Sequence, residues 1–265
     1  MWTRSELKDR AKQVLKLSYW KAFIVSLVIM IVAGGGNSGG RGSSSIRNNV
    51  KNGFQGNDFD SLIYFDKDYS FNMDFDSGVM AIIAIILGVG LIIFLVVLAL
   101  RVFLGAPLEV GGRRYFVQGA QNNADMNNIG YAFNSERYKG IVLTMLWRGF
   151  LNFLWFLLLI IPGIIKAYAY RMVPYILADN PNIGYKRAVE LSVQMTDGEK
   201  FNIFVFDLSF LGWYLLGALA FGLGGLFVNP YKNATEAELY LVLRQNALSR
   251  GLCSYDELFI NDRLM

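Results

Sequence analysis

The chain has 265 residues, of which 54% are hydrophobic and only 17% are charged, with a formal net charge of +4. This balance is typical of a membrane protein. The chain has no histidine and a single cysteine, Cys253. Imidazole metal ligands, histidine general bases, internal disulfides and multi-cysteine metal sites are therefore excluded. We expect one membrane domain over residues 1–265, without a cofactor.

Residues 1–17 have the pattern of an amphipathic helix. Thr3 and Glu6 stand three positions apart, as in a capping box. Apolar residues then recur at helical spacing among lysines and arginines, namely Leu7, Ala11, Val14 and Leu15. Such a helix suits the headgroup plane of a membrane. Anchoring to anionic lipid is the simplest role for it, and peptide binding is the alternative.

Six apolar stretches are candidate membrane spans. Residues 79–100 contain no hydrogen-bonding side chain and are long enough to cross a hydrocarbon core of about 30 Å. The other five are residues 17–33, 140–161, 163–178, 201–216 and 226–243. Pro162 and Gly163 are expected to form the turn between the third and fourth spans. A secretory signal peptide over residues 1–36 is the alternative for the first span.

The distribution of lysine and arginine predicts the orientation of these spans. Residues 1–21, 105–139, 179–200 and 244–265 hold 16 of the 25 basic residues. The alternate segments hold four, all within residues 34–77, where six aspartates outnumber them. The positive-inside rule then places both termini, including a tail at 244–265, in the cytoplasm. The excess of positive charge reflects this bias, and we expect no nucleic-acid partner.

The predicted external segment, residues 34–77, has two parts. Its first part is rich in Gly, Ser and Asn, as flexible linkers are. From residue 65 to 76, aromatic and polar side chains alternate, which predicts a strand or hairpin with an aromatic and an acidic face. Four of its acids, Asp66, Asp68, Asp74 and Asp76, are weak candidates for binding Ca²⁺. Solubilising negative charge is the more economical explanation, because no EF-hand pattern accompanies them.

The spans also form an internal repeat of three helix pairs. In each pair, the second helix carries a proline followed four residues later by a small residue: Pro107 and Gly111, Pro174 and Ala178, Pro230 and Ala234. A second amphipathic pattern, over residues 179–198, precedes the third pair. A proline removes a backbone hydrogen bond and kinks a helix, so three kinks around one axis would form a polar vestibule. The alternative is that proline is simply common in membrane helices.

Ionisable residues inside spans are costly and are functional candidates. Those within or near the last four spans are Arg148, Lys166, Arg171, Asp207, Lys232, Glu236 and Glu238. We expect Asp207 to pair with Arg148 or Arg171, and Lys232 to pair with Glu236 one helical turn away. These groups either hold the helices together as ion pairs or line a cavity that binds an ion, a lipid headgroup or an amphipathic peptide.

No known catalytic motif occurs in the chain. Phosphate-binding loops, HExxH and nucleophile elbows are missing from the sequence. Two carboxylates in different environments suffice for hydrolysis, so Glu109, Glu236 and Glu238 support an alternative as a lipid-modifying enzyme. Nothing in their spacing selects this chemistry, and we expect the protein not to be an enzyme.

Several stretches together resemble a known family. They are residues 6–8 and 19–23, IIPGIIKAYAYRMVPYILADNP at 160–181, and VNPYKNATEAELY at 228–240. They are similar to an uncharacterised family of multi-pass membrane proteins of Gram-positive bacteria and, more distantly, to the membrane portion of some glycerophosphodiester phosphodiesterases. The resemblance implies six spans in a bacterial plasma membrane, and it supplies no catalytic residues.

The sequence therefore predicts an all-α integral membrane protein. Its six transmembrane helices form three hairpin repeats with amphipathic cytoplasmic helices and a small external β-like segment. We expect it to bind or translocate a lipid, a peptide or another amphipathic ligand through a polar cavity that faces the cytoplasm. A scaffold or accessory subunit that binds a second copy or another membrane protein is the alternative.

Overall fold

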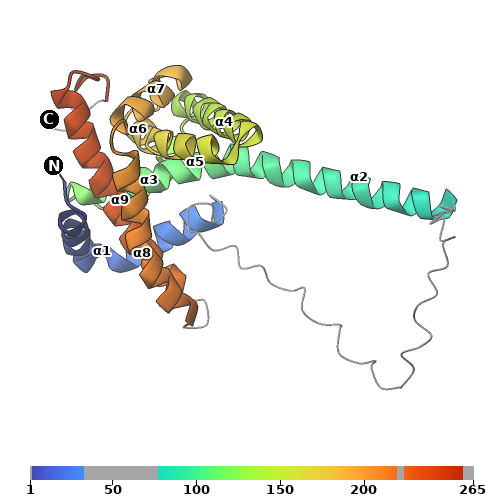
Figure 1. The fold of residues 1–265 in the computed structure, drawn as a ribbon, viewed down its shortest axis with the longest axis horizontal. Helices are drawn as coiled ribbons and strands as arrows, with labels where there is room; N and C mark the ends of the chain where they lie inside the picture. Colours follow the sequence, from blue (N-terminus) through green and yellow to red (C-terminus); the bar gives the residue numbers. More distant parts are fainter. Residues whose placement is uncertain (1, 33–76, 220–223, 259–265) are drawn as a thin grey trace, which may run out of the picture. The chain divides into compact units, whose positions relative to one another are not determined.

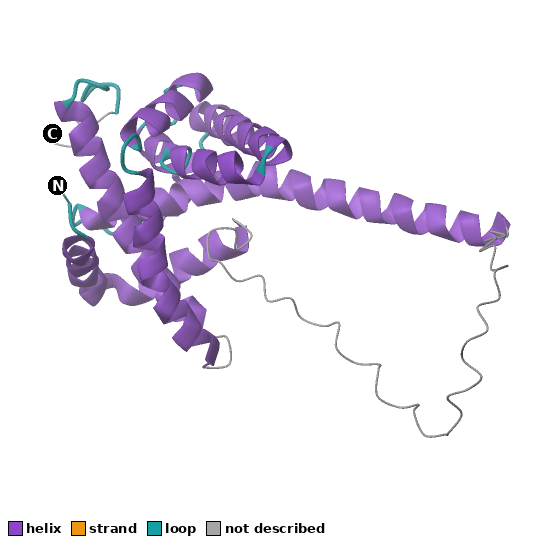
Figure 2. Ribbon diagram, viewed as in Figure 1, coloured by secondary structure: helices purple, strands orange, loops and turns teal. Residues whose placement is uncertain are grey.

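The computed structural model describes residues 2–32, 77–219 and 224–258, and these residues form helices and turns without a strand (Figures 1 and 2). The chain divides into two compact units, residues 1–37 with 98–265, and residues 38–97. The predicted strand at 65–76 and the candidate Ca²⁺ ligands Asp66, Asp68, Asp74 and Asp76 lie outside the described residues. All helices except α2, Ser77–Leu100, belong to the first unit.

Helix α1 spans Arg4–Val32 and changes direction at Ser18, whose backbone is not helical (φ −138°, ψ 23°). The backbone N–H of Glu6 donates a hydrogen bond to Thr3 Oγ1 over 3.3 Å, which confirms the predicted N-cap. The apolar face before Ser18 is buried, with Leu7 and Ala11 at 1% and 0% exposure. Helix α1 packs against α3 and α9, so protein covers this face, and the position of the helix in the headgroup plane stays a prediction.

The segment that follows α2 is helical, although the basic-residue count assigned it to a cytoplasmic connection. A π-helical turn, Arg101–Gly105, leads into α3, Ala106–Ala120. Pro107 follows this π turn within a continuous helical run, since Gly105 and Ala106 both have helical backbone angles. Because proline has no N–H to donate to the residue four positions earlier, the carbonyl oxygen of Phe103 accepts a hydrogen bond from the Tyr138 hydroxyl over 2.8 Å. A short 3₁₀ helix, Met126–Phe133, then connects α3 to α4, Ser135–Leu158.

The turn between the third and fourth predicted spans was placed wrongly. The chain breaks at Leu159, which has an extended backbone (φ −159°, ψ 143°), and α5, Ile160–Ala169, contains both Pro162 and Gly163. Proline is compatible with the first turn of a helix, because those N–H groups have no partner within the helix. Gly163 permits a tight hairpin, since a Cβ atom there would lie 2.6 Å from Cδ1 of Phe156 in α4.

The predicted fourth span is two short helices. After α5, residues 170–172 form a turn, and α6, Val173–Asp179, starts with Pro174 in its first turn. The remaining helices are α7, Tyr185–Met195; α8, Lys200–Leu219; and α9, Gly224–Ser249. Pro230 lies inside α9, which remains one continuous helix. The three prolines therefore differ in effect: Pro107 adjoins a π turn, Pro174 coincides with a break between helices, and Pro230 interrupts nothing.

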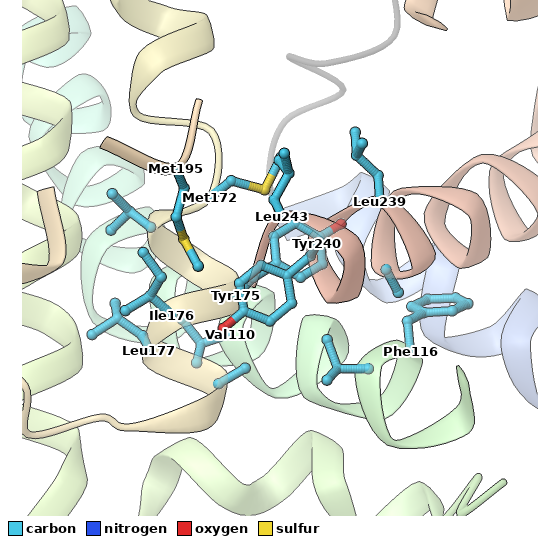
Figure 3. Close-up of a cluster of buried hydrophobic side chains, with 14 of the residues drawn as sticks. Val110, Phe116, Met172, Tyr175, Ile176, Leu177, Met195, Leu239, Tyr240 and Leu243 are labelled. Carbon is cyan, nitrogen blue, oxygen red and sulfur yellow. The ribbon is translucent and has the colours of Figure 1, made fainter. Parts of the chain in front are cut away.

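The core of the first unit lies where α1, α3, α6 and α9 meet. Helix α1 packs on α9 and α3, α3 packs on α6 and α9, and α8 packs on α9, while α4 packs on α5 and α7. Figure 3 shows buried side chains of this core, among them Val110, Ile176, Leu239 and Leu243.

Three helices in the described parts of the chain are long and apolar enough to cross a membrane. They are Arg4–Val32, the helical run Ile82–Ala120 and Ser135–Leu158. Large apolar side chains on α4 are also exposed, for example Phe153 at 64% and Leu157 at 72%. Because soluble proteins rarely expose such surfaces, these helices are compatible with a membrane protein.

Candidate functional site

Five charged side chains that are distant in sequence meet inside the first unit. Arg113 comes from α3, Arg171 from the turn between α5 and α6, Asp207 from α8, and Lys232 and Glu236 from α9. We refer to these five residues as the ion cluster. The turn that holds Arg171 exists because Pro174 cannot continue the α5 hydrogen-bond ladder.

Glu236 is held by three donors. Its Oε2 atom lies 2.9 Å from Arg113 Nη1 and accepts a hydrogen bond from the Tyr175 hydroxyl over 3.0 Å. Its Oε1 atom lies 2.6 Å from Arg171 Nη2. One carboxylate therefore joins two guanidinium groups from different parts of the chain.

Asp207 completes the cluster from α8. Its two oxygens accept a bidentate pair of hydrogen bonds from Arg171, at 2.5 and 2.8 Å, which is the strongest geometry for such a pair. Lys232 Nζ lies 3.7 Å from both Asp207 Oδ1 and Glu236 Oε1. The hydroxyl of Tyr168 donates a further hydrogen bond to Asp207 over 3.1 Å.

The cluster is shielded from solvent. The side chains of Glu236, Arg113 and Arg171 are only 3%, 6% and 6% exposed. Because unpaired charges at such depth are costly, and removing one partner leaves the other uncompensated, the cluster constrains the helices that carry it. Its geometry thus suits a structural role in holding α3, α8 and α9 around the α5–α6 turn.

A hydrogen bond extends the cluster to α1. Asn233 accepts from Arg113 over 2.8 Å and donates to the hydroxyl of Ser26 over 3.0 Å. Ser26 lies in the second half of α1, which is one of the helices able to cross a membrane. The buried polar network therefore connects the first helix of the described residues, α1, with the last, α9.

A second buried pair adjoins the ion cluster through stacked aromatic rings. The ring centroids of Tyr175 and Tyr240 lie 5.2 Å apart, with an angle of 21° between the ring planes. Figure 3 shows the two side chains within the core. The Tyr240 hydroxyl donates to Asp179 Oδ2 over 2.6 Å, and Arg244 Nη1 lies 2.9 Å from the same oxygen. Tyr175 itself bonds to Glu236, so the two polar networks share the α6–α9 contact.

The segment after α9 is bound to α7. Arg187 forms an ion pair with Glu257, with Nε and Oε1 2.6 Å apart, and also donates to the carbonyl oxygen of Leu252. The hydrogen bond from Arg187 holds the pKa of Glu257 below its usual range. Burial raises the pKa of the Cys253 thiol, which favours its unreactive protonated form.

The charged residues predicted to line one ligand cavity lie at several different sites in the structure. The predicted pairs Asp207–Arg171 and Lys232–Glu236 are confirmed. Arg148 does not join Asp207, since it lies 3.7 Å from Glu109 instead. Lys166 lies over the Trp155 ring, with Nζ 4.9 Å from the centroid. Glu238 lies elsewhere on α9 and lines a cavity.

Sequence reasoning missed Arg113, because it counted this residue among the basic residues of a cytoplasmic connection. The available signal was the pair of small residues before it, Gly111 and Gly112, which allow close helix packing. A Cβ atom at Gly111 would lie 2.2 Å from the carbonyl oxygen of Ile129, and one at Gly112 would lie 2.6 Å from Ile29. Arg113 is thus carried on a closely packed helix.

The cavity that Glu238 lines has a volume of about 810 Å³ and lies between α1, α9 and the C-terminal end of α3. Its polar lining includes Arg10, Gln13, Lys21, Glu238 and Gln245. Val14, Leu17, Leu241 and Val242 supply apolar lining. Such volumes hold small organic ligands, and the mixture of polar and apolar lining suits an amphipathic one. We refer to this space as the α1–α9 cavity.

No group of three metal-ligating side chains occurs in the part of the chain that the structure describes.

In the residues that the structure describes, these features define a helical protein with helices able to span a membrane and a buried ion cluster. The family model described as "Protein of unknown function (DUF975)" matches residues 60–247, and the chain belongs to this family. No curated protein and no solved structure matches the chain.

Proposed function

We propose that this protein is a non-catalytic integral membrane protein that binds or translocates an amphipathic ligand through the α1–α9 cavity. The cavity carries the proposal, because its volume of about 810 Å³ and its mixed lining fit a molecule with a polar head and an apolar tail. Leu17, which lines the cavity, is 94% exposed, so apolar surface is available beside the polar groups.

The membrane topology is part of the same proposal. Three helices meet the requirements for a membrane span, and α8, α9 and the α5–α6 pair supply the apolar segments for the others. We infer three hairpins, six spans and cytoplasmic termini in the plasma membrane of a Gram-positive bacterium. The positive-inside distribution of basic residues and the family resemblance support this arrangement. In that orientation the cavity opens toward the cytoplasm, beside the amphipathic half of α1.

The ion cluster stabilises the fold around this cavity. Of the predicted ligand-cavity residues, Arg171, Asp207, Lys232 and Glu236 make ion pairs with one another. Glu238 belongs to the cavity itself.

Two of the three carboxylates considered for catalysis are engaged in ion pairs, and the third, Glu238, lines the cavity. Glu109 lies beside Arg148, and Glu236 is bound by Arg113 and Arg171. Each of these two carboxylates is paired with a guanidinium, so neither is set up as the general acid or base that a hydrolase needs.

The binding function is tested with the full-length protein in detergent and a phospholipid that carries a fluorophore on its acyl chain. We expect the wild-type protein to bind one lipid molecule per protein, with saturation. Ala120→Trp places a large ring in the cavity that Ala120 lines, and it should weaken binding at least tenfold. Ser249→Trp is the matched control, because Ser249 is exposed at the end of α9, outside the cavity lining. Equal binding by all three proteins would overturn the proposal.

The topology is tested separately by cysteine labelling in a Cys253→Ala background. In intact cells, a membrane-impermeant maleimide should label Ser70→Cys and should not label Ser5→Cys. Permeabilised cells should show labelling of both. Labelling of Ser5→Cys in intact cells would contradict cytoplasmic placement of the N-terminus.

A further inference from the structure

Glu238 is an acidic side chain without a partner at a buried position. The residue is only 5% exposed, and within the described residues its side chain makes no hydrogen bond and no ion pair. It differs in this from Glu236, two residues earlier on α9, which has three donors. The Glu238 oxygens are not among the fully buried polar atoms that lack a partner, so the carboxylate reaches the cavity that this residue lines. A partly desolvated carboxylate favours a counter-charge or hydrogen-bond donor opposite it.

The neighbouring basic residue does not supply that counter-charge. Arg10 also lines the α1–α9 cavity, but its guanidinium forms an ion pair with Glu6, with Nη2 and Oε1 2.5 Å apart. Arg10 acts on Glu238 only through longer-range electrostatic attraction. The position opposite the Glu238 carboxylate is therefore suited to a group that enters the cavity from outside.

The charged side chains that line the cavity lie at different depths. Glu238 is buried, whereas Lys21 and Arg10 are exposed, so one negative group lies inside and two positive groups lie nearer the surface. A ligand that matches this order carries a cationic group at its tip and an anionic group behind it. Beside them, Val14 and Leu17 on α1 and Leu241 on α9 offer apolar contacts.

We propose that the α1–α9 cavity selects a zwitterionic aminophospholipid, whose ammonium group binds Glu238 and whose phosphate lies near Arg10 and Lys21. The acyl chains then lie along the apolar lining and the exposed side chain of Leu17, which leads toward the membrane. This inference rests on the proposed function and identifies the class of ligand at the same site.

The test compares three lipids with identical, fluorophore-labelled acyl chains: phosphatidylethanolamine, N-acetyl phosphatidylethanolamine and phosphatidylglycerol. All three carry the phosphate, and only the first carries the ammonium group. The wild-type protein should bind phosphatidylethanolamine at least tenfold more tightly than either other lipid, a difference of about 1.4 kcal/mol. This comparison needs no variant, so it does not depend on the folding of a mutant.

Variants then locate the preference. Glu238→Gln keeps the shape of the side chain and should lower the affinity for phosphatidylethanolamine to that for phosphatidylglycerol. Glu190→Gln, at an exposed position on α7, is the matched control and should leave all affinities unchanged. Lys21→Gln should weaken binding of all three lipids by a similar factor, because it faces the phosphate that they share.

The outcomes separate this inference from the proposed function. Saturable binding without preference for the ammonium group, or a preference that survives in Glu238→Gln, would overturn the inference and leave lipid binding intact. Binding of free phosphoethanolamine as tight as that of the lipid would show a headgroup metabolite as the ligand and would overturn the lipid assignment. No saturable binding of any of them would overturn the proposed function itself.

Discussion

Replacement of Glu236 by glutamine tests the structural role of the ion cluster. The substitution keeps the size of the side chain and removes the negative charge that faces both guanidiniums. In the native protein Glu236 lies 2.9 Å from Arg113 and 2.6 Å from Arg171, and its side chain is 3% exposed. Both arginines would then lose one partner at positions where solvent cannot replace it. Asp207 would remain to pair with Arg171, but Arg113 would have no acidic partner in this cluster.

The size of the effect follows from the burial of the pair. Removal of one partner of a buried ion pair costs about 3–5 kcal/mol. For a chain of this size, 1 kcal/mol shifts the unfolding midpoint by about 2–4 °C, so the midpoint of Glu236→Gln should fall by roughly 6–20 °C. Thermal unfolding of the purified protein in detergent, followed by circular dichroism, measures this shift.

Glu190→Gln provides the control for this measurement. Glu190 also pairs with an arginine, Arg187, but over 3.6 Å and with a side chain that is 59% exposed. Exposed pairs contribute about 0–1 kcal/mol, so the midpoint of the control should change little. If Glu236→Gln melted within 1–2 °C of wild type, a range that corresponds to less than about 1 kcal/mol, the reasoning that the buried cluster holds the helices together would be refuted.

Two further predictions concern other contacts. Gly111→Ala should lower the unfolding midpoint markedly, because its Cβ atom would lie 2.2 Å from the Ile129 carbonyl oxygen. Gly149→Ala is the control, since its Cβ atom would have nothing within 4 Å, and it should leave the midpoint unchanged or raise it. Equal effects of the two substitutions would contradict the close packing at Gly111. Arg187 lowers the pKa of Glu257 in the folded state, so the stability advantage of wild type over Glu257→Gln should be complete at neutral pH. It should start to shrink as the pH falls below about 4.3, the usual pKa of a glutamate, and vanish below the lowered pKa of the folded state; an advantage that did not change with acidification would show that the charge is not its source.

The sequence predicted contacts that depend on local spacing. Lys232 and Glu236 are one helical turn apart, and their pairing follows from helix geometry. The pairing of Asp207 with Arg148 or Arg171 was predicted because one acid in the spans had to serve the nearby bases, and the structure has Arg171. The apolar face of the first half of α1 was also predicted from its spacing, although the sequence did not show that α1 packs against α3 and α9.

Other features depend on which distant segments meet. Arg113 binds a carboxylate on α9. The glycines at 111 and 112 indicate close helix packing, but the local sequence does not show which carboxylate the arginine meets. The break at Leu159 was missed because Pro162 and Gly163 are the stronger turn signals, yet proline is equally at home in the first turn of a helix. The isolation of Glu238 is likewise a property of its three-dimensional surroundings, since its near neighbour Glu236 has several partners.

An experimentally determined structure in a lipid nanodisc that contains phosphatidylethanolamine tests the central proposal most directly. The proposal predicts density for one lipid in the α1–α9 cavity, with its headgroup against Glu238 and its acyl chains beside Leu17. A cavity that holds only water, or that is closed by protein side chains in the membrane, would contradict the proposed function.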